Sequence, residues 1–136
     1  MHELFEHTAD LGLRIRAADL NTLFAEAGEC LLSSMLDNPD AVRPVQSVTF
    51  NIPGTDRDFL LFDWLRLLLN YAEDQRFLCC KYELNVTDSG LSGTAWGEPI
   101  DPTRHLLSRE VKAITYHELK VVREGDAWLA EVIVDI

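Results

Sequence analysis

Apolar and charged residues alternate near the start of the chain in a way that predicts a strand over residues 11–17. Leu13 and Ile15 are apolar, whereas Arg14 and Arg16 lie between them and beyond them. A period of two places the apolar side chains on one face of a strand and the charged side chains on the other. We therefore expect a half-buried strand close to the N-terminus.

Two stretches with apolar residues at helical spacing predict two main helices. The first is expected over residues 19–36, because Asp19 can cap its N-terminus and the residue before Pro39 avoids helical dihedrals. The second is expected over residues 56–74, with a cap from Thr55 or Asp56. Its apolar residues cover more than one stripe, so it should be the most buried element.

Alternation and turn residues predict that most of the remaining chain is β-structure. Asp88-Ser89-Gly90 and Glu124-Gly125-Asp126 indicate hairpin turns. Nothing resembling a linker divides the chain, so residues 1–136 are expected to form one compact α+β domain with two main helices packed on largely antiparallel sheet. Further strands are expected over residues 48–52, 82–86, 91–97, 110–117, 119–122 and 128–134, with loops over 41–46 and 98–107.

The predicted strand over residues 110–117 carries one charged side chain among apolar neighbours. Strand geometry would place Lys112 on one face together with Ile114 and Tyr116, and His117 on the other. A lysine there usually marks a solvated face or edge. The functional alternative is a countercharge for a carboxylate cluster or a ligand phosphate.

Composition narrows the classes of function. The chain has 136 residues, of which 47% are hydrophobic, and its 23 acidic and 12 basic residues give a net charge of −11. Such a surface should repel nucleic acid, whose binding depends on Lys and Arg, but it could bind a basic protein partner. No apolar run reaches the ~20 residues of a membrane span, and Met1-His2-Glu3 does not resemble a secretion leader. The sequence therefore predicts a cytoplasmic protein without membrane association.

The chain lacks the common catalytic motifs. Cys30, Cys79 and Cys80 are odd in number and have no CxxC spacing, so we expect buried or half-buried thiols rather than disulfides or a metal site. There is no phosphate-binding glycine loop and no histidine near a cysteine in sequence. His2 and His105 are expected at the surface.

Each end of the chain carries an aspartate beside a predicted strand. If the ends meet, Asp10, Asp135 and the terminal carboxylate of Ile136 would cluster, and each pair at ~4 Å would repel by about 4 kcal/mol at an effective dielectric near 20. A cation would remove that cost, and oxygen ligands suit calcium or magnesium. The alternative is that Asp10 caps a turn and the C-terminus is frayed. His7 could be a ligand, a base or an ordinary strand-end histidine.

Several stretches resemble the archease family, in the same order along the whole chain. The most specific are HTAD at residues 7–10 and EVKAITYH at residues 110–117. A departure is Arg66-Leu67, where the family tends to carry an Asn-Glu pair. The other similar stretches are residues 5–13, 19–24, 58–65, 97–101 and 134–136.

The resemblance implies a partner protein rather than an enzyme. Archeases assist the RtcB-type RNA ligase, which uses GTP and divalent metal to join RNA ends in tRNA splicing and RNA repair, and they promote its guanylylation and multiple turnover. The resemblance implies that Asp10, Asp135 and the Ile136 carboxylate hold a divalent cation, calcium first, with magnesium or manganese as alternatives. His7, Lys112 and His117 are expected to support these ligands or to contact the partner.

Two other functions are compatible with the residues. A metal-dependent hydrolase could use Asp10, Asp135 and His7, although no convincing nucleophile or base pair accompanies them. A chaperone-like binding module could use an apolar sheet edge. For the activator of an RNA ligase, the net charge suggests that RNA is contacted only indirectly.

Overall fold

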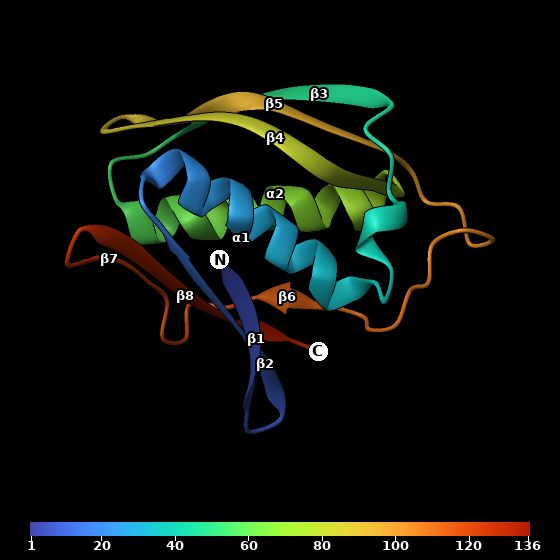
Figure 1. The fold of residues 1–136 in the computed structure, drawn as a ribbon, viewed down its shortest axis with the longest axis horizontal. Helices are drawn as coiled ribbons and strands as arrows, with labels where there is room; N and C mark the ends of the chain where they lie inside the picture. Colours follow the sequence, from blue (N-terminus) through green and yellow to red (C-terminus); the bar gives the residue numbers. More distant parts are fainter.

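The fold places two helices between two antiparallel sheets. The computed structural model describes residues 1–136, and Figure 1 shows a three-stranded sheet on one side of the helices and a five-stranded sheet on the other. Neither helix has the length and apolar character that crossing a bilayer requires. The elements in chain order are β1 (His2–His7), β2 (Asp10–Ala17), α1 (Leu20–Met35), the 3-10 turn η1 (Pro39–Ala41), β3 (Gln46–Pro53), α2 (Arg57–Asp74), β4 (Phe77–Thr87), β5 (Gly90–Pro99), β6 (Ala113–Ile114), β7 (Lys120–Glu124) and β8 (Ala127–Asp135).

The five-stranded sheet joins the two ends of the chain through β2. This strand pairs with β1 on one side and with the C-terminal strand β8 on the other, and Leu11 lies opposite Val134. Both β6 and β7 pair with the free side of β8, at its two different ends. The second sheet has the order β3-β5-β4.

Charged side chains form a row across the outer face of the five-stranded sheet. Arg14 bonds to Glu3 on β1 and to Glu131 on β8, at 3.1 Å in each case, and Lys120 of β7 lies 3.8 Å from Glu131. These residues occupy paired register positions. A slip of one residue would move all of them to the apolar face, so the row and the core favour the same register.

The hairpin of β1 and β2 is held together by an aromatic contact over a glycine. A Cβ atom on Gly12 would lie 2.2 Å from the Phe5 ring, so only glycine leaves room for this ring. The guanidinium of Arg14 covers the same ring at 4.2 Å from its centroid. Gly12 and Phe5 are register partners, and this contact fixes the strand that leads to His7 and Asp10.

The helices occupy the core as the apolar pattern predicts. Asp19 caps α1 by accepting a hydrogen bond from the Thr22 N–H, and Asp56 caps α2. Fully buried Trp64 on α2 donates its indole N–H to the Phe24 carbonyl on α1 at 2.8 Å. Its ring also packs beside Phe50 of β3, so one side chain joins both helices to the smaller sheet.

The predicted strand over residues 110–117 is wrong in extent. Only Ala113–Ile114 form a strand, because β7 occupies the other part of the same side of β8 and the chain must turn between them. The expected sharing of faces fails as well: buried Val111 and Ile114 are three residues apart, and Lys112 is exposed. The turn contains Glu118, whose φ of 54° is left-handed.

His105 is buried, with only 2% of its surface exposed, and the prediction that it lies at the surface is wrong. Its Nδ1 accepts the Asp101 N–H at 2.9 Å, so its Nε2 donates to buried Glu98 at 3.1 Å. Glu98 also accepts from the Arg43 backbone N–H at 2.7 Å and from the Arg104 side chain. Two loops far apart in sequence are thereby joined through one carboxylate.

Burial raises the pKa of Glu98, but hydrogen bonds from the Arg43 backbone, Arg104 and His105 lower it by more, so this pKa lies below its ordinary value of 4.5. The stabilisation is therefore complete above pH 4.5 and is lost as the pH falls through the folded-state pKa. We predict that Glu98→Gln lowers the free energy of unfolding at pH 7 by about 1–3 kcal/mol, and by less at pH 3.5. Urea denaturation at both pH values measures this.

Glu83→Gln is the matched control, because Glu83 is exposed on β4 and makes no ion pair. It should leave the free energy of unfolding almost unchanged at both pH values. An equal effect of the two substitutions, or a Glu98→Gln deficit that grows in acid, would contradict the role assigned to the network.

Candidate metal centre

The turn between β1 and β2 places the HTAD residues at the end of the five-stranded sheet. His7 and Asp10 are the last register pair of the hairpin, with Thr8 and Ala9 between them. Thr8 has a φ of 53°, which is uncommon for a β-branched residue. Such a conformation costs about 1–3 kcal/mol and persists only where the surrounding structure imposes it.

The register of the sheet also places the two aspartates opposite each other. Leu11 and Val134 are the last paired residues of β2 and β8 at this end, and continuing the register by one step puts Asp10 opposite Asp135. Opposed residues of an antiparallel pair point to the same face, here the face away from the helices, because buried Leu11 and Val134 occupy the other. Neither carboxylate makes a side-chain hydrogen bond or ion pair.

The C-terminal residues complete this end of the sheet. Ile136 directly follows Asp135 and is partly buried against the core. Lys112 donates its backbone N–H to the Asp135 carbonyl at 2.7 Å, so the lysine lies next to the aspartates in the fold. The donor set of two unpaired carboxylates and a terminal carboxylate fits a hard divalent cation such as calcium. The ligand assignment to Asp10, Asp135 and Ile136 stays a prediction.

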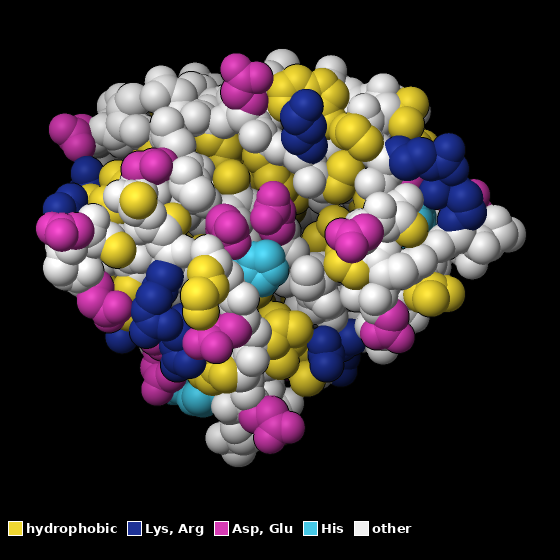
Figure 2. Space-filling view, in the orientation of Figure 1, with side chains coloured by type: hydrophobic (Ala, Val, Ile, Leu, Met, Phe, Trp, Pro, Cys, Tyr) yellow, Lys and Arg dark blue, Asp and Glu magenta, His cyan; other side chains and the backbone are white.

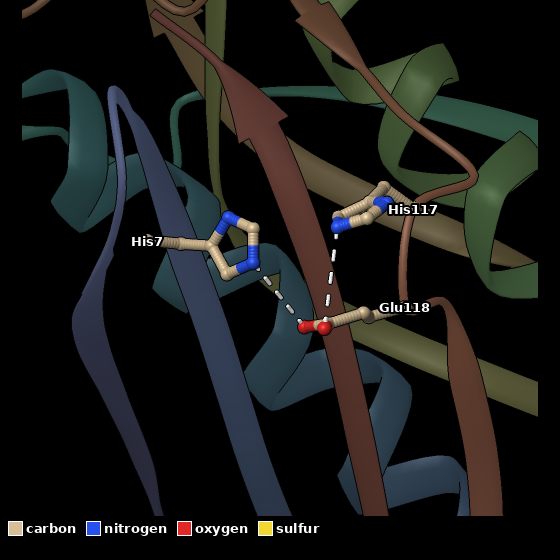
Figure 3. Close-up of side chains that lie close together, drawn as sticks. All are labelled: His7, His117 and Glu118. Atoms are coloured by element: carbon tan, nitrogen blue, oxygen red, sulfur yellow. Dashed lines mark ion pairs between the residues drawn. The ribbon is translucent and has the colours of Figure 1, made fainter.

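A second cluster lies beside the first, around Glu118. Its Oε2 lies 3.5 Å from His7 Nε2 and its Oε1 lies 4.0 Å from His117 Nε2. The two imidazole rings meet edge to face, with 5.0 Å between their centroids (Figure 3). The structure thus brings together His7 and His117, which the sequence proposed separately. Sequence reasoning missed Glu118 as a member, although its position directly after His117 was a signal.

The three cysteines contribute nothing to this end of the molecule. Burial raises the pKa of both the Cys30 and the Cys79 thiol to about 12. Cys79 is on β4, in the other sheet, and Cys30 is on α1. Thiols that stay protonated are poor nucleophiles, in agreement with the expectation that they are structural.

Comparison with known proteins identifies the family. The family model described as "Archease protein family (MTH1598/TM1083)" matches residues 2–136. The chain belongs to the archease family. Among archeases, the protein of Methanopyrus kandleri is 39% identical, with 98% of each chain covered, and that of Sulfurisphaera tokodaii is 37% identical, covering 98% of this chain and 97% of that protein.

Solved structures of the family share the fold. The solution structure of Methanobacterium thermoautotrophicum protein 1598 has a TM-score of 0.80 and 33% identity, covering 99% of this chain and 98% of the other. A crystal structure from Thermotoga maritima, described as an archease and possible chaperone, has a TM-score of 0.68, 22% identity and coverage of 100% and 98%. The predicted α+β class with two main helices and antiparallel sheet is confirmed.

We predict that calcium stabilises this archease through the opposed aspartates. A ligand at one hundred times its Kd raises the free energy of unfolding by about 2.7 kcal/mol. Asp10→Asn or Asp135→Asn should abolish this gain and also stabilise the calcium-free protein, because each removes one repelling charge. Denaturation with and without calcium measures both effects. Asp126→Asn, in the turn just before β8 and so far from Asp135, is the control and should keep the calcium response.

The terminal carboxylate has a separate test. We predict that residues added after Ile136 weaken calcium binding by moving the negative charge away from Asp10 and Asp135, whereas residues added before Met1 are tolerated better. Met1 lies at the other end of β2, where its ammonium group donates to the Arg16 carbonyl. Calorimetric titration of both extended forms compares the affinities. Equal calcium affinity would remove Ile136 from the ligand set.

Proposed function

We propose that this protein is an accessory activator of an RtcB-type RNA ligase and is not itself an enzyme. Membership of the archease family over residues 2–136 supports the proposal most strongly. In the proposed role the protein promotes GTP-dependent guanylylation of the ligase and its multiple turnover during tRNA splicing and RNA repair. It acts on the ligase protein and reaches RNA only indirectly.

The surface charge supports a protein partner over an RNA partner. With a net charge of −11, the molecule repels phosphate backbones and attracts basic protein surfaces, which accelerates association. On the face shown in Figure 2, acidic side chains are interspersed with a smaller number of basic ones. The attraction is therefore distributed over that face rather than limited to one acidic patch.

Exposed aromatic side chains near the two clusters are suited to a protein interface. Tyr116, directly before His117, is 60% exposed and stacks on Phe62 of α2 with 4.1 Å between ring centroids. Phe59 is 55% exposed and meets the same tyrosine edge to face at 5.7 Å. Aromatic anchors of this kind carry much of the energy in protein interfaces. We propose that the ligase contacts this surface and the adjacent end of the sheet.

The residues at the sheet end have a defined task in this proposal. In this proposal Asp10 at the start of β2 and Asp135 at the end of β8 each supply an oxygen donor, and the terminal carboxylate supplies a third. A divalent cation bound there supplies positive charge that offsets the negative charge of a nucleotide triphosphate or its pyrophosphate product. The chain's own contribution is to position the donors beside the interface and to keep Lys112 close to them.

We predict that Asp10→Asn and Asp135→Asn reduce stimulation of covalent GMP transfer to the purified ligase by at least about tenfold, as expected when a metal ligand is lost. The readout is the rate of labelled GMP incorporation with and without this protein. Asp126→Asn should stimulate like the unmodified protein. Full stimulation by both folded aspartate variants would contradict the proposal.

The same assay separates the alternative functions. A stand-alone hydrolase would release phosphate or cut nucleic acid without the ligase. A chaperone-like module, the role suggested in the description of the Thermotoga maritima protein, would increase the amount of folded ligase without changing the GMP transfer rate per active molecule. An exposed aromatic surface suits such a module as well, which makes normalisation to active ligase necessary.

A further inference from the structure

We propose that His7, His117 and Glu118 form a second metal site, which takes a first-row transition ion of zinc type rather than calcium. The three side chains come from two segments that are far apart in sequence: the end of β1 and the turn between β6 and β7. They offer two imidazole nitrogens and a carboxylate, and these ligand atoms lie within 4.8 Å of one another. The proposal is independent of the ligase.

The geometry lies close to that of a coordinated ion. Ligand atoms about 2.0–2.1 Å from a tetrahedral zinc ion are roughly 3.4 Å apart. The separation from His7 Nε2 to Glu118 Oε2 is 3.5 Å, and that from His117 Nε2 to Glu118 Oε1 is 4.0 Å. Small side-chain rotations would therefore bring all three onto one ion. Figure 3 shows one nitrogen of each imidazole directed at the Glu118 carboxylate between them.

The contacts within the group are ion pairs of 3.5 Å and 4.0 Å, which are longer than ordinary hydrogen bonds. Neither histidine makes a hydrogen bond to Glu118, and the Nδ1 atom of His7 is buried with no hydrogen-bond partner. The only polar contact of the His7 ring is therefore with this cluster. The side chains of His117 and Glu118 are more than half exposed, so an ion can enter and keep a coordination position open to solvent.

A second histidine-carboxylate group in the molecule provides a contrast. His2 lies near Glu26 and Glu29, but its Nδ1 is only 2.7 Å from Glu26, which also pairs with the Met1 ammonium at 3.4 Å. His2 and Glu26 therefore already have internal partners, and an ion would have to break these contacts. Around Glu118 the contacts to His7 and His117 are longer, at 3.5 Å and 4.0 Å, and neither is a hydrogen bond, so this group is selected as the site.

Ligand chemistry separates this site from the neighbouring aspartates. Imidazole nitrogen suits zinc, cobalt, nickel and copper, and two histidines with one carboxylate are a recurrent donor set for zinc and non-haem iron. Carboxylates alone suit calcium and magnesium. Although His7 pairs with Asp10 in the sheet, the two sites should therefore select different ions.

Titration of the metal-free full-length protein with zinc chloride and, as a spectroscopic probe, cobalt chloride tests the proposal. The unmodified protein should bind one zinc ion per chain, and a large excess of calcium should not displace it. His117→Gln and Glu118→Gln should each weaken zinc binding by at least about tenfold, since even the outer partners of metal ligands contribute that much. His2→Gln is the matched control and should bind zinc unchanged.

Thermal denaturation provides a second readout that does not depend on spectroscopy. Because His117 is largely exposed, His117→Gln should unfold at the unmodified temperature without metal. Zinc should raise the midpoint of the unmodified and His2→Gln proteins but not that of His117→Gln. The proposal is overturned by the absence of zinc binding, by zinc binding that depends on His2, or by zinc binding that Asp10→Asn abolishes while His117→Gln retains it.

Discussion

The arrangement of the site depends on the register between β2 and β8. These strands come from opposite ends of the chain, and their pairing places Leu11 opposite Val134 in the core and Asp10 opposite Asp135 on the outer face. A shift of one residue would bury charges and expose the apolar row, which costs far more than any single contact. The outer row through Arg14 and Glu131 supports the same register. The register that the core requires therefore also sets the positions of the two aspartates.

The strand β8 also organises the second cluster. β7 pairs with one part of the free side of β8 and β6 pairs with another part, so the chain between β6 and β7 must reverse direction. The reversal contains Glu118 in a left-handed conformation and carries His117 toward His7. Like Thr8, Glu118 is a strained residue held in place by strands on both sides. The two turns meet through the His7 and His117 rings and through the His7–Glu118 ion pair.

The molecule separates its stabilising groups from its candidate functional groups. Trp64 and the buried Glu98 network use polar groups in hydrogen bonds that join layers or loops, and the helix caps bond to their own helices. At the sheet end, by contrast, Asp10 and Asp135 lack partners, and the His7 ring has one buried nitrogen without a hydrogen bond. Unsatisfied polar groups are costly in a folded protein, and His7 Nδ1 is one of two buried side-chain atoms without a hydrogen-bond partner, the other being Arg57 Nε at the start of α2.

The sequence by itself determined the elements whose signals are local. Both helices, their caps at Asp19 and Asp56, and the β4–β5 and β7–β8 hairpins follow from periodicity and turn residues, because neighbours in the chain provide those interactions. Only the tertiary structure decided that the helices lie between two separate sheets and that β6 is short. It also decided the burial of His105 and the contact of His7 with Glu118. These features depend on contacts between residues that are distant in sequence. The free side of β8 is shared between β6 and β7, which keeps β6 short, and buried Glu98 needs hydrogen-bond donors from another loop, which buries His105. Asp10 and Asp135 illustrate both parts. The sequence shows that both residues are aspartates near strands, but the register between β2 and β8 decides that they lie at the same end of the sheet.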